Sequence, residues 1–168
     1  MVPERVCASA GEARGSSCYH CEMRRADEAT VIDAVVAGAI AAVVSGIPST
    51  AHAIITRHNP LEASLAAGTL LLPREQRWTR LLPAAMVAHA LLSLGWACVL
   101  AALLPRRRTV EAATLAGLAI AALDLGCVGR RFPRIRALPL LPQVLDHLAY
   151  SVTVAAVLRA RRGRRRAA

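Results

Sequence analysis

Long apolar runs alternate with short polar segments along the chain, and the four longest cover residues 31–56, 81–104, 109–128 and 138–158. Each run has at least 20 residues, and an α-helix needs about 20 residues to cross a hydrocarbon core of about 30 Å. Their high Ala and Leu content favours helix, and the alternating segments expected of transmembrane strands do not occur in the sequence. The pattern predicts an all-α fold, a polytopic membrane bundle of four transmembrane helices.

A fifth apolar stretch, residues 61–72, is too short to span a bilayer comfortably. In the sequence "NPLEASLAAGTLLLP", Asn59 can cap a helix, Pro60 suits its first position and Glu62 suits its positive end. The helix would end by Pro73, after about 12 residues and about 18 Å. We therefore expect a short interfacial or re-entrant helix between the first and second spans.

Composition strengthens the membrane assignment. Hydrophobic residues make up 55% of the 168 residues, charged residues make up 19%, and the mean hydropathy is +0.43, whereas soluble domains carry about a quarter charged residues. The charges cluster outside the apolar runs, because a charge at the bilayer centre costs about 2.5–3.5 kcal/mol. We expect a disordered tail over residues 1–29, a transmembrane domain over residues 30–158 and an arginine-rich cytoplasmic tail over residues 159–168.

The basic side chains indicate how the chain lies in the membrane. All 21 Lys+Arg residues are arginine, and the net charge is +10. Because the arginines lie directly outside apolar runs, as in "LLPRRRTV", they predict contact with anionic lipid headgroups and no contact with nucleic acid. With four spans, 13 arginines lie on the side of the termini and eight on the other, whereas five spans give 11 and 10. The positive-inside rule therefore favours four spans, with both termini cytoplasmic.

Two interpretations of the first 29 residues stay open. The run "CYHC" places Cys18, His20 and Cys21 at a spacing that a zinc knuckle would use, although a second ligand pair is missing from the sequence. Alternatively, translation begins at Met23, and the preceding residues are absent from the native protein. Neither interpretation assigns a cofactor to the transmembrane domain.

The stretch "SGIPSTAHAII" places a proline, hydroxyl residues and a histidine inside the first span. Pro48 removes a backbone hydrogen bond and bends the helix, which exposes carbonyl groups that Ser45, Ser49 or Thr50 can help to satisfy. A kink explains the proline and the hydroxyl residues. It leaves His52 to be explained.

Ionisable residues from all four spans fall at one predicted depth, roughly 8–9 Å from the non-cytoplasmic end of each helix. This layer contains His52, His89, Asp124, Asp146, His147 and Tyr150. Because intramembrane ionisable residues face a bundle interior or a watery cavity, one interpretation is a site that binds or relays a proton, a small cation or a small ligand. A second is a hydrogen-bonded polar plug that orients the helices, with histidine donating to aspartate or to carbonyls freed by Pro48. A third is that these side chains merely reach the headgroups.

Small residues are frequent in the first and third spans, as in "AVVAGAIAAVVSG" and "AATLAGLAIAALDLG". Such segments let helices approach closely, either within one bundle or between copies of the chain in an oligomer. Both segments also contain Ile-Ala-Ala followed by a glycine four residues later. This faint repeat is consistent with two tandem helical hairpins.

The combination of "SGIPSTAHA", "NPLEA", "LSLGWA", "ALDLG", "GRRFP" and a closing "DHLAY" resembles small bacterial inner-membrane proteins of the actinobacterial type. The His147-x-x-Tyr150 ending is also similar to that of YagU-like inner-membrane proteins. The resemblance covers Ala34 to Leu158 and implies a four-helix membrane protein without an assigned activity, so no catalytic residue is carried over. We expect a non-enzymatic integral membrane protein that binds or relays a small cation or proton through its His/Asp layer. The alternative is a purely structural or partner-binding bundle.

Overall fold

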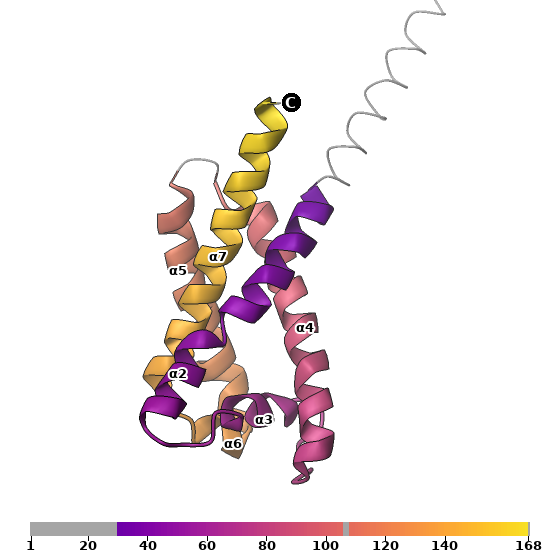
Figure 1. Cartoon of the computed structure of the whole chain (residues 1–168), viewed down its shortest axis with the longest axis vertical. Coiled ribbons are helices and arrows are strands. Elements are labelled where there is room, and N and C mark those ends of the chain that lie inside the picture. Colours follow the sequence, from indigo (N-terminus) through magenta and orange to yellow (C-terminus); the bar gives the residue numbers. More distant parts are fainter. Residues whose placement is uncertain (1–29, 106–107, 168) are drawn as a thin grey trace, which may run out of the picture. The chain divides into compact units, whose positions relative to one another are not determined.

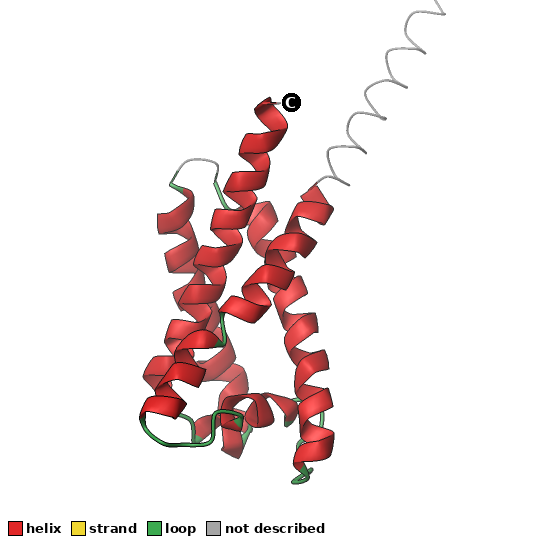
Figure 2. Cartoon of the chain, viewed as in Figure 1, coloured by secondary structure: helices red, strands yellow, loops and turns green. Residues whose placement is uncertain are grey.

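The computed structural model describes residues 30–105 and 108–167, which are almost entirely helical and contain no strand (Figure 1, Figure 2). Within these residues, four helices are long and apolar enough to cross a membrane: Thr30–Ile55, Trp78–Leu103, Thr109–Arg131 and Leu140–Arg165. The predicted all-α bundle of four transmembrane helices is therefore confirmed. Residues from Asp33 onward form one compact unit. The predictions for residues 1–29, which are a zinc knuckle, a start at Met23 and a disordered tail, lie outside the described residues.

The first span consists of a helix over residues 30–44, a turn at Ser45–Gly46, and α2 (Ile47–Ile55). The remaining elements are α3 (Glu62–Gly68), α4 (Trp78–Leu103), α5 (Thr109–Ala121), the π-helical segment η1 (Ala122–Val128), the 3₁₀ segment η2 (Gly129–Arg131), α6 (Pro133–Arg136) and α7 (Leu140–Ala167). α5 and α2 pack against α7, and α3 packs against α4 and α6.

The break in the first span lies slightly before the proline that predicted it. Pro48 occupies the first turn of α2, where its missing N–H is tolerated. The hydroxyl of Ser45 donates to the Ala42 carbonyl at 3.3 Å, and the hydroxyl of Ser49 donates to the Gly46 carbonyl at 3.4 Å. The Gly46 carbonyl also accepts from the backbone N–H of Thr50 at 3.1 Å, so the break does not leave it free. The use of hydroxyl groups to satisfy carbonyls freed by Pro48 therefore stays a prediction.

The short helix α3 begins at Glu62, later than the sequence predicted. The Asn59 side chain accepts a hydrogen bond from the Leu61 N–H at 3.0 Å and so forms a turn before the helix instead of capping it. A Cβ added at Gly68 would lie 2.3 Å from the Leu81 carbonyl oxygen. With seven residues, α3 is too short to cross a bilayer, as predicted.

The third span changes its helical form near its end. In η1, the Gly129 N–H donates to the Asp124 carbonyl, five residues back, which is the π-helical pattern. A Cβ added at Gly129 would lie 3.0 Å from that carbonyl oxygen, so a larger residue would crowd the wider turn. Such segments are rare and often occur at functional sites.

α7 continues without a break through the segment predicted as a separate arginine-rich tail. Arg161 and Arg165 donate to the buried carboxylate of Asp33 near the start of the first span. Arg162 donates to the Ala101 carbonyl near the end of α4, at 3.0 Å. These contacts give the polar end of α7 partners on two other spans, which explains why the helix extends beyond its apolar residues.

Small side chains form the interfaces between the spans. The buried face of the first span repeats at helical spacing and includes Ala34, Ala37, Gly38 and Ala41. A Cβ added at Gly38 would lie 2.8 Å from the Ala97 Cβ of α4. The predicted close approach of helices is therefore confirmed within the bundle.

Large apolar side chains lie on the outside of the same helices. Examples are Val43, Ile55, Leu103, Leu115 and Leu141, each at least 69% exposed. A surface of this kind suits contact with lipid tails and would be unfavourable in water. By the length, composition and surface of its helices, the chain is a multi-pass membrane protein.

Candidate functional site

Asp124 of η1 and His147 of α7 face each other between the third and fourth spans. The Asp124 Oδ2 and His147 Nε2 atoms lie 3.4 Å apart, and the two side chains are 25% and 20% exposed. The sequence placed both residues in the polar layer, and the structure brings them together as a pair.

The His147 ring has a defined orientation. Its Nδ1 atom lies 2.7 Å from the Gln143 carbonyl oxygen, one turn earlier on α7. Because a carbonyl oxygen only accepts, Nδ1 carries a hydrogen. Nε2 faces a carboxylate oxygen, and two lone pairs at this distance would repel each other. Favourable contact therefore requires one proton between Nε2 and Oδ2, carried either by the imidazole or by the carboxyl group.

Asp146, the residue before His147, acts at the break in the first span. Its Oδ1 atom accepts a hydrogen bond from the backbone N–H of Ser49 at 2.9 Å. Ser49 lies in the first turn of α2, where N–H groups lack helical partners and the helix dipole favours negative charge. The carboxylate of α7 therefore caps a helix that belongs to another span.

His89 of α4 contacts the other side of the same break. Its Nε2 atom lies 2.8 Å from the Ala42 carbonyl oxygen, so Nε2 is the donor. The Ala42 carbonyl belongs to the helix that ends before the break. The broken backbone is thus held from two sides, by a histidine of the second span and by an aspartate of the fourth.

These groups form one electrostatic cluster. His89 and Asp146 contact the backbone on the two sides of the break, and His147, which follows Asp146 in the chain, faces Asp124. Four of the six residues predicted for the polar layer therefore lie together around the break. The packing of the elements explains this grouping, because α2, α4 and α5 all contact α7.

The other two predicted residues lie apart from this cluster. The Tyr150 hydroxyl donates to the Ser93 carbonyl of α4, and the side chain is buried. Tyr150 therefore joins α7 to α4 one turn beyond the Asp124–His147 pair. His52 lies one turn beyond Ser49, in the wall of a pocket.

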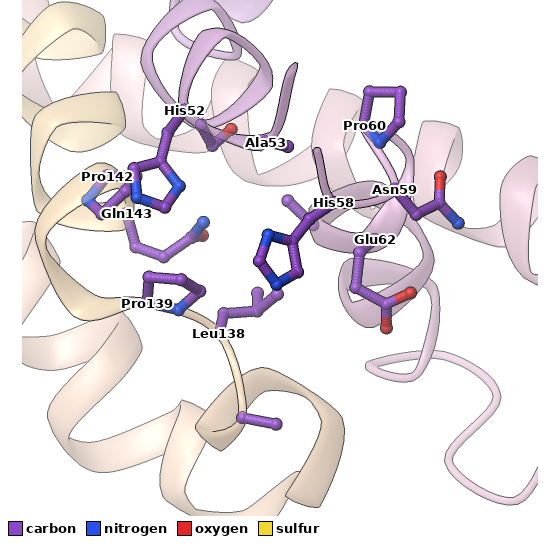
Figure 3. Close-up of a pocket in the computed structure, with 13 residues that line it drawn as sticks. His52, Ala53, His58, Asn59, Pro60, Glu62, Leu138, Pro139, Pro142 and Gln143 are labelled. Carbon is purple, nitrogen blue, oxygen red and sulfur yellow. The ribbon is translucent and has the colours of Figure 1, made fainter. Parts of the chain in front are cut away.

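This pocket has a volume of about 190 Å³ and lies between α2, the following loop, α3 and the start of α7. Its polar lining residues are Ser49, His52, His58, Asn59, Glu62 and Gln143, and its apolar walls are mostly proline, alanine and leucine. Figure 3 shows the rings of His52 and His58 on opposite sides of the pocket, with the Gln143 side chain near His52. His58 and Gln143 were missed by the sequence analysis. Gln143 had a usable signal, because it precedes His147 by one helical turn in an apolar run.

An ion pair outside the membrane-spanning helices holds one side of the pocket. Arg134 of α6 donates to both carboxylate oxygens of Glu62, at 2.7 and 3.2 Å. These hydrogen bonds outweigh partial burial, lowering the pKa of Glu62 and raising the pKa of Arg134. The two residues therefore stay charged near neutral pH and join α3 to α6.

The described parts of the chain bring no three His, Cys, Asp or Glu side chains close enough to hold a metal ion. No family model, curated protein or solved structure matches the sequence. The resemblance to small bacterial inner-membrane proteins therefore stays a prediction, and the geometry of the polar cluster is the basis for the function.

Proposed function

We propose that the protein binds and exchanges a proton at the Asp124–His147 pair, within the membrane-spanning bundle. One observation carries the proposal. The hydrogen bond from His147 Nδ1 to the Gln143 carbonyl leaves Nε2 facing the Asp124 carboxylate, so the pair needs a shared proton. Histidine is suited to this role because its proton affinity lies near neutral pH.

The surroundings of the pair give proton binding a route to the rest of the fold. Asp146 is adjacent to His147 and caps α2 through Ser49. A change of charge on the pair acts on Asp146 through their electrostatic interaction, and therefore on the contact that holds the break. The protein would then couple proton occupancy to the position of α2. In this proposal, α2 is the element whose position responds to proton binding at the predicted site.

The proposed setting is a bacterial inner membrane with both termini cytoplasmic, the orientation that the arginine distribution favours. The end of the bundle with α3 and α6 would then face the non-cytoplasmic side. The arginines of the last turns of α7 would meet anionic headgroups on the cytoplasmic side.

A second candidate is a structural bundle whose polar residues only hold helices together. It is favoured by three contacts to backbone groups: His89 to the Ala42 carbonyl, Asp146 to the Ser49 amide and Tyr150 to the Ser93 carbonyl. In this case the Asp124–His147 contact, which joins two side chains, also serves only to hold helices together. Replacing His147 by a residue that keeps a donor and an acceptor would then leave the protein unchanged.

Nitrogen NMR on protein labelled with ¹⁵N-histidine separates the two candidates. In the wild-type protein in nanodiscs, we expect His147 to show a protonated or strongly hydrogen-bonded Nε2 that loses its proton as the pH rises. Asp124→Asn should remove this signature, and the pocket variant His58→Gln should retain it. A His147 ring that stays neutral and unchanged at every pH would contradict the proposal. Calorimetry with Zn²⁺ tests the cation form of the function, for which the described residues supply no group of three ligands. Heats of binding in the wild type that vanish in His147→Gln would support that form.

A further inference from the structure

We propose that the pocket lined by His52 and Gln143 is the water-filled entrance through which the Asp124–His147 pair exchanges its proton. This inference rests on the proposed function and assigns the pair its access route. The ligand of the pocket is water and its protonated form.

The pocket shares two residues with the polar cluster. Gln143 lines the pocket, and its backbone carbonyl accepts the hydrogen bond from His147 Nδ1. Ser49 also lines the pocket, and its backbone N–H donates to Asp146. Asp146 is therefore hydrogen-bonded to one lining residue of the pocket, Ser49, and His147 to another, Gln143.

The lining is suited to water. A volume of about 190 Å³ accommodates several water molecules. The polar side chains supply the hydrogen-bond partners that ordered water needs, and they come from α2, α3, α7 and the loop after α2. An imidazole can accept a proton on one nitrogen and release another from the second, so His52 can pass protons along without a net change.

The opposite side of the pair is closed by packing. Gly117 of α5 lies against Ser151 and against the backbone of His147, where an added Cβ would lie 2.2 Å from the Ser151 Oγ and 3.0 Å from the His147 carbonyl oxygen. Beyond this contact lie the buried side chains of Val154 and Leu158. Access through the pocket is therefore the more open of the two directions along α7.

Charged and titratable groups near the route come from every element around it. They are His52 on α2, His58 on the following loop, Glu62 on α3, Arg134 on α6, His89 on α4, Asp124 on η1, and Asp146 and His147 on α7. Arg134 neutralises Glu62, so the carboxylate of Glu62 does not hold protons in the pocket. The two histidines supply ring nitrogens that can donate hydrogen bonds to water in the pocket or accept them from it.

The test measures how fast the ring protons of His147 exchange with water, by NMR on full-length protein in nanodiscs. Ala137→Trp places a bulky ring at the pocket, and Ala90→Trp places the same ring on an exposed position of α4 outside it. We expect Ala137→Trp to slow the exchange by roughly tenfold or more while the protonated signature of His147 stays, and Ala90→Trp to leave both unchanged. His52→Gln keeps the volume of the pocket and removes its relay, so it should slow exchange as well.

The outcomes test two claims separately: proton binding at the Asp124–His147 pair, and access to the pair through the pocket. A wild-type protein without the protonated signature overturns the proposed function and the route with it. A wild-type signature together with unchanged exchange in both Ala137→Trp and His52→Gln overturns the route alone. Thermal melting identifies a variant that fails to fold. If either Ala137→Trp or His52→Gln fails to fold, the exchange rate in the other variant decides whether the route is correct.

Discussion

Gly117 lies so close to Ser151 that a Cβ added to the glycine would be 2.2 Å from the serine Oγ. This close contact joins α5 to α7 directly beside the backbone of His147. We expect Gly117→Ala to destabilise the bundle by about 1–3 kcal/mol, because the added methyl forces the two helices apart. Unfolding of the purified protein in a detergent titration measures the change.

Gly95 on α4 supplies the matched control, because a Cβ added there meets nothing within 4 Å. Gly95→Ala should be neutral or stabilising by up to about 1 kcal/mol, since alanine is the better helix former. Equal effects of the two substitutions would show that close packing at Gly117 does not matter.

Asp33 joins the first span to the end of α7. Its buried carboxylate accepts from Arg161 and Arg165, which are partly exposed. We expect Asp33→Asn to destabilise the protein by about 1–3 kcal/mol, less than a fully buried ion pair would, because water reaches the arginines. Proteolysis of the C-terminal turns should also become faster. Glu111→Gln, an exposed carboxylate on α5, should change neither measurement.

Because of the Glu62–Arg134 pair, we expect the stability of the folded protein to decrease at acidic pH. Hydrogen bonds from Arg134 lower the pKa of Glu62 in the folded state. Stability from this pair is therefore present above the unfolded pKa of about 4.3 and is lost as the pH falls through the lower folded value.

Glu62→Gln removes that contribution. Near neutral pH the loss should be at most about 1 kcal/mol because the pair is partly exposed, and the melting temperature of the variant should fall less steeply on acidification. Melting curves in detergent from about pH 3 to 7 test this. Parallel curves for the two proteins would contradict the role of the pair.

Asp146 holds the break in the first span by accepting from the Ser49 amide. Asp146→Ala leaves that amide without its acceptor and should destabilise the protein by about 1–3 kcal/mol. Asp146→Asn keeps an acceptor and should recover most of the stability. If asparagine also abolishes the response of α2 to pH, the charge of Asp146 has a role beyond capping. Hydrogen exchange at residues 47–55 reports on α2 in each variant.

The four-span arrangement makes a topological prediction. Reporter fusions placed after Arg57 and after Arg77 should lie on the same side of the membrane, because α3 does not cross it. They should report the non-cytoplasmic side if the arginine distribution sets the orientation. Reporters on opposite sides would mean that the segment between these residues spans the bilayer.

The sequence predicted the spans well because hydropathy and helix length are local properties. Their ends moved by a few residues, and α7 extended furthest, since Asp33 and Ala101 lie far from its arginines in the sequence. The position of the break was also local, and the structure moved it only from Pro48 to Ser45–Gly46. Both segments of the faint repeat change helical geometry, one at this turn and the other in η1.

The partners of the polar residues could not be predicted in the same way. Counting residues inward from the helix ends placed His52 beside Asp146, but the capping bond goes to the Ser49 amide, one turn earlier. Backbone groups are identical at every position, so a sequence cannot show that His89 would find the Ala42 carbonyl. The π-helical turn that carries Asp124 also depends on packing around Gly129, which periodicity does not show.

The bond between Asp146 and Ser49 joins residues 97 positions apart, and this separation affects biosynthesis. The first span leaves the ribosome with its break open and enters the lipid long before α7 is made. Until then the Ser49 amide has no carboxylate, and it must rely on water or lipid headgroups. The span made first is therefore among the last to reach its final shape, and the insertion of α7 completes it.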